Sequence, residues 1–192
     1  MRKLITGFKV SLDMKFQGPG EYADWVPSWS EDYDLGDTID ACMLGGAMYP
    51  GYERYWSAMR SNPLAPSPIT GTVATAAERD WSARIPKLPH YVLSRSLDQS
   101  DWPNTHFLRR LGQIADLKAQ AGKDIYLMGG GALFKALTAA GLVDEIRLIV
   151  HPVAAGGPHD LFAADAPRQS LQLIRSQSLP DGLQRLDYAI VG

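Results

Sequence analysis

The segment with the clearest chemical potential is a run of three glycines, Gly129, Gly130 and Gly131. It follows a short apolar stretch, residues 125–128, and precedes a helical pattern over residues 132–140. A glycine turn between a strand and a helix lets the backbone approach a ligand, and the N–H groups at the helix start favour a phosphate. The pattern predicts phosphate binding at this turn. The alternative is a tight turn that needs unusual dihedral angles.

This glycine run differs from the usual dinucleotide-binding fingerprint. Phe134 stands where the third glycine of that fingerprint is expected, and the run lies late in the chain, whereas the fingerprint normally opens its domain. No P-loop lysine follows the glycines either. A nucleotide site here would therefore belong to another type.

Two other predicted strands end in residues that suit a ligand. Ser94 and Arg95 follow the strand expected over residues 89–93, and ligands gather beyond the carboxyl ends of parallel strands. A hydroxyl beside a forked guanidinium suits a 2′-phosphate, and the alternative is a solvated arginine on a loop. A second strand runs into glycines and a helix, where the backbone can again approach a ligand, at Leu44-Gly45-Gly46-Ala47-Met48-Tyr49.

Several other kinds of site are excluded or left open by the residue types. Cys42 is the only cysteine, which excludes an internal disulfide and a cysteine-built zinc site. The histidines lack metal-ligand spacing, and no nucleophile elbow of the G-x-S-x-G type occurs, so we expect no metal and no serine hydrolase. One aromatic group either walls a site for a flat ring or packs in the core or at a dimer surface: Tyr22, Trp25, Trp29 and Tyr33.

Composition indicates one globular domain over residues 1–192. Hydrophobic residues make up 45% and charged residues 21% of the 192 residues, which is normal for a folded protein. The formal net charge of −2 provides no basic face for a nucleic-acid backbone. No signal peptide and no stretch of about 20 apolar residues is recognised, so we expect a cytoplasmic protein that does not span a membrane.

Apolar periodicity and turn residues predict an alternation of strands and helices. Strands are expected over residues 3–11, 40–44, 89–93, 124–128 and 145–153, and helices over 28–39, 47–59, 72–84, 106–121 and 132–140. Residues 170–179 and 183–191 predict a hairpin with its turn at Pro180-Asp181-Gly182. This order predicts an α/β fold whose mainly parallel central sheet has helices on both faces and an antiparallel C-terminal edge hairpin.

Taken in order, these segments resemble the dihydrofolate-reductase-like superfamily, which has a three-layer fold. They are most similar to its small bacterial members, which are like the C-terminal reductase domain of the bifunctional riboflavin-biosynthesis deaminase-reductase. The resemblance covers nearly the whole chain and depends on the order of its pieces, since none is specific alone. The pieces are Val10-Ser11-Leu12-Asp13, Leu44-Gly45, Tyr91-Val92-Leu93-Ser94-Arg95-Ser96-Leu97, Gly129-Gly130-Gly131-Ala132-Leu133, Gly141-Leu142-Val143-Asp144-Glu145, and His151-Pro152-Val153 before Leu161-Phe162.

The resemblance implies an NADPH-dependent reductase, usually a homodimer, that acts on a small heterocyclic or aminosugar substrate. The nearest known activity is that of 5-amino-6-(5-phosphoribosylamino)uracil reductase. In such proteins the serine–arginine strand end meets the adenosine phosphate, here Ser94 and Arg95. The glycine turn holds the pyrophosphate, and the glycine-helix segment after the second strand covers the other side. These segments are Gly129, Gly130, Gly131, Ala132 and Leu133, and Gly45, Gly46, Ala47 and Met48.

The chain departs from the family pattern at three positions. Gly46 stands where an arginine that holds the cofactor phosphate is usual. Gly7 and Met128 stand where the riboflavin-pathway reductases carry a lysine and a glutamate, which argues against their substrate. A true dihydrofolate reductase and a non-catalytic nucleotide-binding protein are therefore alternatives. The folate-facing carboxylate has no convincing match among Asp24, Glu31, Asp32 and Asp34.

Asp13 is the candidate catalytic residue. It lies just after the first predicted strand, where a carboxylate can position the substrate or the water that delivers a proton. The alternative is an aspartate that merely forms the turn.

Overall fold

The computed structural model describes residues 1–18, 23–30, 33–67 and 71–191. Its contacts group the chain into two compact units. Unit 1 comprises Met1–Arg2 and Pro27–Ile125, and unit 2 comprises Lys3–Val26 and Tyr126–Gly192. That residues 1–192 act as one domain stays a prediction.

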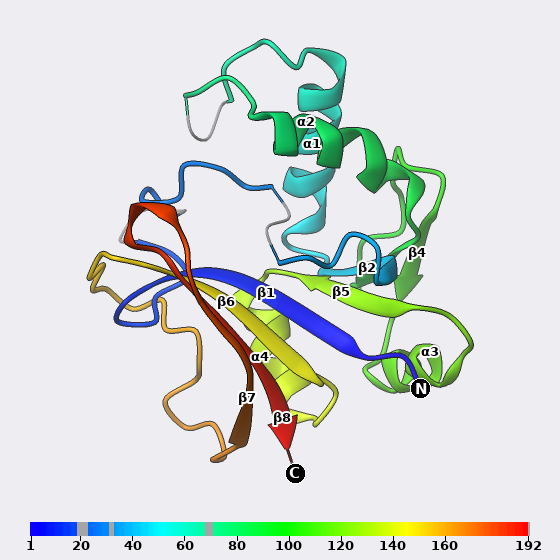
Figure 1. Ribbon diagram of the computed structural model, residues 1–192. Helices are drawn as coiled ribbons and strands as arrows, with labels where there is room; N and C mark the ends of the chain where they lie inside the picture. Colours follow the sequence, from blue (N-terminus) through cyan, green and yellow to red (C-terminus); the bar gives the residue numbers. More distant parts are fainter. Residues whose placement is uncertain (19–22, 31–32, 68–70, 192) are drawn as a thin grey trace. The chain divides into compact units, whose positions relative to one another are not determined.

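The strands form one eight-stranded sheet (Figure 1). They are β1 (Leu4–Ser11), β2 (Ile39–Gly45), β3 (His90–Leu93), β4 (Thr105–Leu108), β5 (Asp124–Met128), β6 (Glu145–His151), β7 (Ser170–Ser178) and β8 (Gln184–Val191), in the order β4-β3-β2-β5-β1-β6-β8-β7. β1 pairs parallel with β6, and β3 pairs parallel with β2 and β4, whereas β8 pairs antiparallel with β6 and β7. The predicted α/β class, with a mainly parallel sheet and an antiparallel C-terminal hairpin, is confirmed.

In unit 1, helix α1 (Tyr49–Ser61) follows β2 and buries an aromatic face. Tyr49, Tyr52 and Trp56 are buried, and the Tyr52 hydroxyl lies 3.2 Å from Nε2 of the buried His90. Pro50 stands in the first turn, where its missing N–H costs no helical hydrogen bond. The expected helix over residues 47–59 is thus confirmed with a start two residues later.

Helix α2 (Ala76–Arg84) starts later than the expected residue 72 because Thr75 caps it. The Thr75 hydroxyl accepts from the Glu78 N–H, and the Glu78 carboxylate accepts from the Thr75 N–H. This capping box satisfies two backbone donors that the helix itself cannot. A short 3₁₀ turn, Ile85–Lys87, then leads into β3.

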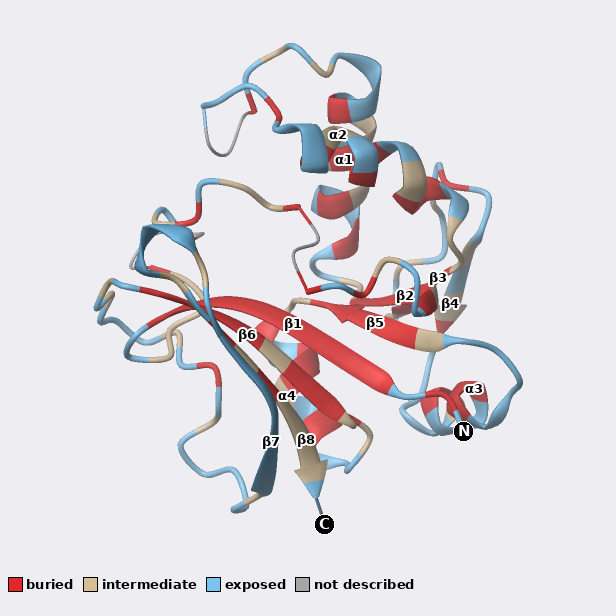
Figure 2. Cartoon of the chain, viewed as in Figure 1, coloured by how far each residue is buried: buried red, intermediate tan, exposed pale blue. Residues whose placement is uncertain are grey.

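In unit 2, β1 is buried along its whole length, whereas β7 is exposed along its whole length (Figure 2). One face of β1 packs on helix α4 (Gly131–Ala139), since the rings of Phe8 and Phe134 lie 5.1 Å apart in an edge-on arrangement. The hairpin of β7 and β8 turns at Pro180–Gly182, with Asp181 in the left-handed region at φ 58°. The expected strands, helix and hairpin of this unit are confirmed.

The opposite face of this part of the sheet is charged although it is buried. Arg185 and Asp187 on β8 are 3% and 4% exposed and form a bidentate ion pair, with Nη2 2.9 Å from Oδ2. Arg147 on β6 stands opposite Asp187 in the pairing and donates to Glu145 at 3.1 Å. Buried charges persist only when they are paired and hydrogen-bonded, so this network is a sensitive part of the fold.

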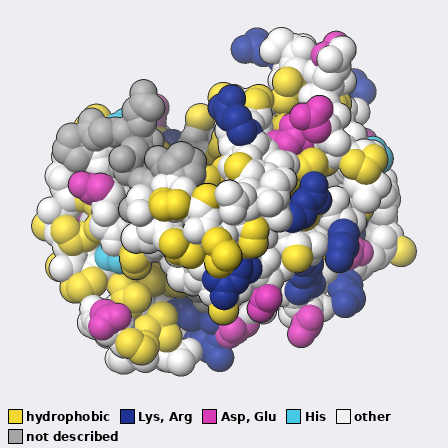
Figure 3. Space-filling model, turned by 90° about the horizontal axis from the view of Figure 1, so that it is seen from above, with side chains coloured by type: hydrophobic (Ala, Val, Ile, Leu, Met, Phe, Trp, Pro, Cys, Tyr) yellow, Lys and Arg dark blue, Asp and Glu magenta, His cyan; other side chains and the backbone are white. Residues whose placement is uncertain are grey.

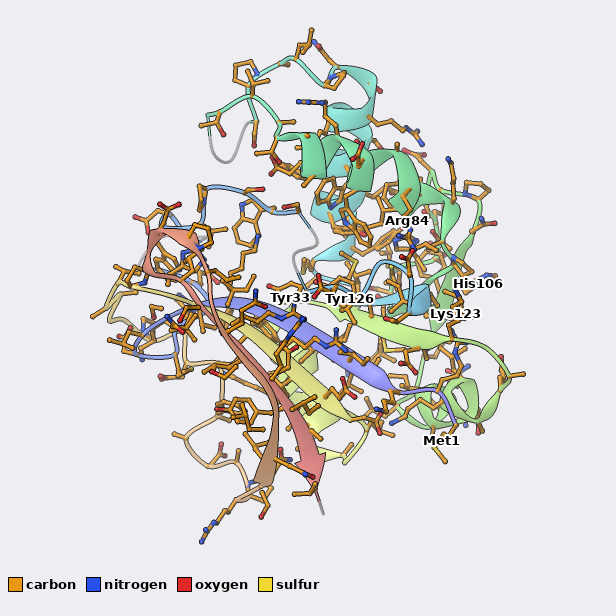
Figure 4. The ribbon with its side chains drawn as sticks, viewed as in Figure 1. Met1, Tyr33, Arg84, His106, Lys123 and Tyr126 are labelled. Atoms are coloured by element: carbon orange, nitrogen blue, oxygen red, sulfur yellow. The ribbon has the colours of Figure 1, made fainter. Side chains whose placement is uncertain are left out.

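The predicted helix over residues 28–39 is wrong. Residues 28–30 and 33–38 are irregular, β2 begins at Ile39, and Glu31 and Asp32 lie outside the described residues. Asp34 adopts a left-handed φ of 53°, which no helix contains. Lys123 fixes the segment by donating from Nζ to the Asp37 carbonyl at 2.9 Å (Figure 4). Tertiary contacts therefore outweigh the local capping signal.

The single helix expected over residues 106–121 is also wrong in its first part. Residues 105–108 form β4, in parallel register with β3, and α3 (Gly112–Ala119) begins only after them. The His106 ring, labelled in Figure 4, stacks on Tyr91 with centroids 5.2 Å apart. Pairing with a neighbouring strand decides this segment, and apolar spacing alone cannot distinguish the two structures.

Candidate functional site

The carboxyl ends of β2, β3 and β4 in unit 1 lie level with one another. Gly45 pairs with Leu93, and Leu93 pairs with Leu108. Gly46 N donates to the Leu93 carbonyl at 2.9 Å, and Ser94 N donates to the Leu108 carbonyl at 3.0 Å. The residues just beyond these three ends therefore share one edge, where parallel α/β sheets bind ligands.

Gly46 is a glycine because Ser94 lies against it. A Cβ at residue 46 would stand 2.4 Å from the Ser94 Oγ and 3.3 Å from its Cα. The structure thus brings together two of the predicted site residues. It also gives a physical reason for the departure at Gly46, since any side chain there would displace the turn after β3.

Ser94 organises a turn that carries Arg95. The Ser94 Oγ accepts from the Leu97 N–H at 2.9 Å and from the Ser96 N–H at 3.3 Å, so this hydroxyl holds the turn. Arg95 is exposed and has no hydrogen-bond or ion-pair partner among the described residues. Its guanidinium is thus available to a ligand at the strand ends.

The segment Gly45 to Met48 leads directly into α1. Met48 N donates to the Gly45 carbonyl at 3.1 Å, and Met48 is the N-cap residue without a side-chain cap. The first N–H groups of a helix have no intrahelical acceptors, and the helix dipole favours an anion beside them. This helix start lies beside the turn that carries Arg95, because Gly46 contacts Ser94.

In unit 2, the local structure explains why each of residues 129, 130 and 131 is a glycine. Gly129 and Gly130 adopt φ of 60° and 83°, which other residues rarely adopt. A Cβ at Gly131 would meet the Phe16 ring at 2.4 Å. Gly130 is the N-cap of α4 and provides no side-chain cap. The tight-turn interpretation and phosphate binding are therefore compatible here, since the turn leaves the helix start without a cap.

Asp13 clamps the loop after β1 to the loop after β6. Its Oδ1 accepts from the Ser11 hydroxyl at 2.6 Å and from the Ala155 N–H at 2.9 Å, and its Oδ2 accepts from the Gly156 N–H at 2.8 Å. The Ser11 hydroxyl and these two backbone donors lower the Asp13 pKa from 3.8 to about 2. The carboxylate is therefore ionised at neutral pH and cannot itself donate a proton. Its catalytic role stays a prediction.

Replacing Asp13 by asparagine is expected to change the acid stability of the protein. Because the folded-state pKa lies below the unfolded value of 3.8, the carboxylate stabilises the fold above about pH 4, and this contribution is lost as the pH falls towards 2. The melting temperatures of the wild type and Asp13→Asn should differ at pH 6 and converge near pH 2. Asp165→Asn, an exposed residue without these contacts, is the control. If the two melting temperatures differed by the same amount at every pH, the ionised Asp13 carboxylate would not be what stabilises the fold.

The other residues singled out in the sequence, two departures from the family pattern and the aromatic group, lie in different parts of the two units. Gly7 is buried in β1 with Arg147 as its register partner on β6, and Met128 is buried at the end of β5. Of the aromatic group, Tyr22 lies outside the described residues and Tyr33 is buried. Trp29 is half-buried in unit 1, and its backbone N–H donates to Glu78 at 2.9 Å. Trp25 is half-buried in unit 2.

Sequence reasoning missed Arg109. It follows β4 immediately, so its backbone lies at the same edge as Gly46 and Ser94, and its side chain contacts the turn after β3. The feature that identifies it is the short strand Thr105–Leu108, a segment that the sequence pattern predicts as the start of a helix. A strand there would have placed Arg109 at a carboxyl end.

Charges, possible metal ligands and helix lengths add three observations. Figure 3 shows lysine and arginine side chains interspersed with acidic and apolar ones on the face drawn. Within the described ranges, no three His, Cys, Asp or Glu side chains gather as metal ligands. In the same ranges, no helix combines the length and the apolar character needed to cross a membrane.

Known relatives share the sequence or the fold over nearly the whole chain. The YyaP protein of Bacillus subtilis (strain 168), itself uncharacterized, is 27% identical over 200 residues, which cover 97% of this chain and 94% of YyaP. A putative riboflavin biosynthesis protein from Shewanella sp. PV-4 matches in structure with a TM-score of 0.68 at 18% identity, over 100% of both chains.

Two further structures show the same fold. A pyrimidine reductase-like protein from Corynebacterium diphtheriae gives a TM-score of 0.61 at 16% identity, over 100% of this chain and 92% of that one. Dihydrofolate reductase from Enterococcus faecalis, in complex with NADP(H) and RAB-propyl, gives a TM-score of 0.58 at 14% identity, over 99% of this chain and 97% of that one. The dihydrofolate-reductase-like fold is thereby confirmed.

The model of one protein family, described as the RibD C-terminal domain, matches residues 2–185. This match includes every residue predicted for the site, from Asp13 to Leu133. The chain belongs to the RibD C-terminal domain family.

Proposed function

We propose that the protein is a cytoplasmic, NADPH-dependent reductase that transfers a hydride to a small heterocyclic or aminosugar substrate. The observation that carries this proposal is the strand-end edge of unit 1. There an exposed arginine, Arg95, stands on an ordered turn beside the uncapped start of α1. Membership of the RibD C-terminal domain family supports the reductase class.

The described residues fit such a cofactor. Arg95 offers a forked donor set suited to the 2′-phosphate, and Gly45, Gly46, Ala47 and Met48 present backbone beside it. Taken by itself, unit 2 has an α4 start without a side-chain cap at residues 129–133, and its N–H groups suit a phosphate. NADPH, when bound, supplies the hydride. The protein contributes binding and orientation.

The described residues say less about the substrate than about the cofactor. Hydride transfer to the carbon of a C=N or C=O bond leaves the nitrogen or oxygen to take a proton. Because Asp13 is ionised, we propose that it positions the substrate or a water while a different donor supplies the proton. Gly7 and Met128 replace the lysine and glutamate of the riboflavin-pathway reductases, so the substrate differs in the groups that those side chains contact.

The test is consumption of NADPH with a panel of heterocycles. The panel includes dihydrofolate and 5-amino-6-(5-phosphoribosylamino)uracil, with Asp13→Ala as a companion protein. Turnover of a uracil or related ring supports the proposal, and unchanged turnover by Asp13→Ala removes that residue from the mechanism. Turnover of dihydrofolate that an antifolate blocks supports the first alternative. Cofactor binding without turnover of any compound supports a non-catalytic nucleotide-binding protein.

We also propose that the protein is a homodimer that pairs through the β7–β8 hairpin. Leu171 and Leu173 on β7 are 40% and 51% exposed and stand opposite Ile190 and Tyr188 of β8. An exposed apolar face on an edge strand is a usual association surface.

Leu173→Lys is expected to convert the dimer to a monomer, because it places a charge in this apolar face. Light scattering after gel filtration measures the mass. Gln177→Lys, on the same strand opposite Arg185, is the matched control and should stay dimeric. A monomeric wild type would contradict this proposal.

A further inference from the structure

His151 ends strand β6 with a buried ring nitrogen that has no hydrogen-bond partner among the described residues. The residue is 6% exposed, and the nitrogen is Nε2. His90 is also buried, but both of its ring nitrogens are paired, Nε2 with the Tyr52 hydroxyl at 3.2 Å and Nδ1 with the Leu88 carbonyl at 2.9 Å. Since a buried polar atom without a partner costs stability, packing explains His90 and does not explain His151.

The His151 ring lies on the face of the unit 2 strands that turns away from α4. Side chains alternate along a strand, and Phe8, whose register partner is Leu148, packs on α4. His151 therefore projects from the opposite face, together with its register partner Ser11 of β1. Both residues end parallel neighbouring strands, so the ring lies at a carboxyl-end edge, where α/β sheets bind ligands.

Charged groups stand on the same face of these strands or close to it. Burial of the ring and, to a smaller extent, the charge of the 8% exposed Lys9 on β1 lower the pKa of His151. Arg185 of β8 projects from the same face, and the Ser11 hydroxyl donates to Asp13 at 2.6 Å. With a lowered pKa, the protonated ring gives up its proton more readily than an ordinary histidine does.

We propose that His151 is the proton donor for the hydride transfer described under the proposed function, on which this assignment rests. The substrate carbon gains the hydride that NADPH supplies, leaving NADP⁺, and the electron pair of the C=N or C=O bond passes to the nitrogen or oxygen. That atom takes the proton from Nε2 of the imidazolium, and the neutral imidazole regains a proton from water. Asp13 is ionised and cannot serve as this donor.

The first arm of the test needs no substrate and measures thermal unfolding of the ligand-free protein. His151→Leu removes a buried nitrogen that makes no hydrogen bond, so the melting temperature should stay the same or rise by up to about 4 °C. His90→Leu, the matched control, removes two hydrogen bonds and should lower the melting temperature by at least about 2 °C. Equal losses in the two variants would make His151 a structural residue and overturn the proposal.

The second arm follows a single turnover of NADPH with a panel compound that the wild type reduces. His151→Leu and His151→Asn should slow it by about 10²- to 10⁴-fold while NADPH affinity changes less than about twofold. His106→Gln, which changes an exposed histidine of β4, should react at the wild-type rate. Because only the imidazolium donates, the wild-type rate should fall about tenfold per pH unit above the His151 pKa, which lies below 6.5.

The pH dependence separates a proton donor from a residue that only supports the fold. In both His151 variants this dependence should disappear. If either variant keeps the wild-type rate or the wild-type pH dependence, the assignment of His151 fails while the reductase proposal stands. If the wild type binds NADPH and reduces no panel compound, the reductase proposal fails and this assignment fails with it.

Discussion

Replacing Asp187 by leucine is expected to lower the free energy of unfolding by about 3–5 kcal/mol, because it removes one partner of a buried, bidentate ion pair. Asp187 is 4% exposed, and it accepts from Arg185 through both oxygens, at 3.0 Å to Oδ1 and 2.9 Å to Oδ2. Arg147 stands opposite Asp187 on β6, so the loss also places two arginines near each other without this carboxylate. Chemical denaturation measures the change.

The control is the double variant Arg185→Met with Asp187→Leu. Removing both charges removes the whole ion pair instead of one partner, and an apolar pair of similar volume is often neutral or stabilising. The double variant should therefore recover most of the lost stability. A single variant that costs less than about 1 kcal/mol would show that water or another group compensates Arg185.

Replacing Phe134 by alanine is expected to cost about 3–5 kcal/mol, which corresponds to a melting temperature roughly 6–20 °C lower. Phe134 is 0% exposed in α4, with its ring 5.1 Å from that of Phe8 and 5.8 Å from that of Phe162. The deletion leaves a cavity between α4 and β1. Because α4 begins at the glycine turn, loosening this helix should also lower the affinity for any ligand that binds at residues 129–133.

Phe162→Ala is the matched control for that prediction. Phe162 contacts the same ring but is 37% exposed, so its removal should cost only about 1 kcal/mol. Thermal unfolding of the three proteins gives the comparison. Equal losses for the two variants would mean that the Phe8–Phe134 contact does not anchor the helix.

Local patterns predicted the fold well where they coincide with the tertiary structure. The strand that precedes the glycine run and the helix that follows it are both present, because apolar residues and glycines specify them locally. Residues 28–39 and 105–108 behave differently. A left-handed Asp34 and pairing of β4 with β3 override helical signals there, and neither can be read from neighbouring residues.

In the candidate site, too, local patterns predict some features and only the tertiary structure reveals others. That Ser94, Arg95 and the glycine segments follow the ends of strands could be predicted from the apolar runs before them, and their part in ligand binding stays a prediction. The contact of Gly46 with Ser94 and the anchoring of Arg109 depend on which strands are neighbours, so only the structure reveals them. Asp13 follows β1 as the sequence predicts, and its hydrogen bonds to Ala155 and Gly156 are contacts that sequence spacing cannot show. Its catalytic role stays a prediction.

The most direct test of the central claim is a titration of tryptophan fluorescence with NADPH and with NADH, on wild type and Arg95→Gln. The chain has five tryptophans to report binding, and a thermal shift can be read alongside. We predict that NADPH binds about tenfold tighter than NADH, and that Arg95→Gln removes this preference. At 100 times its dissociation constant, NADPH should add about 2.7 kcal/mol of stability. If neither cofactor changes the fluorescence or the melting temperature, the NADPH-dependent reductase proposal is contradicted.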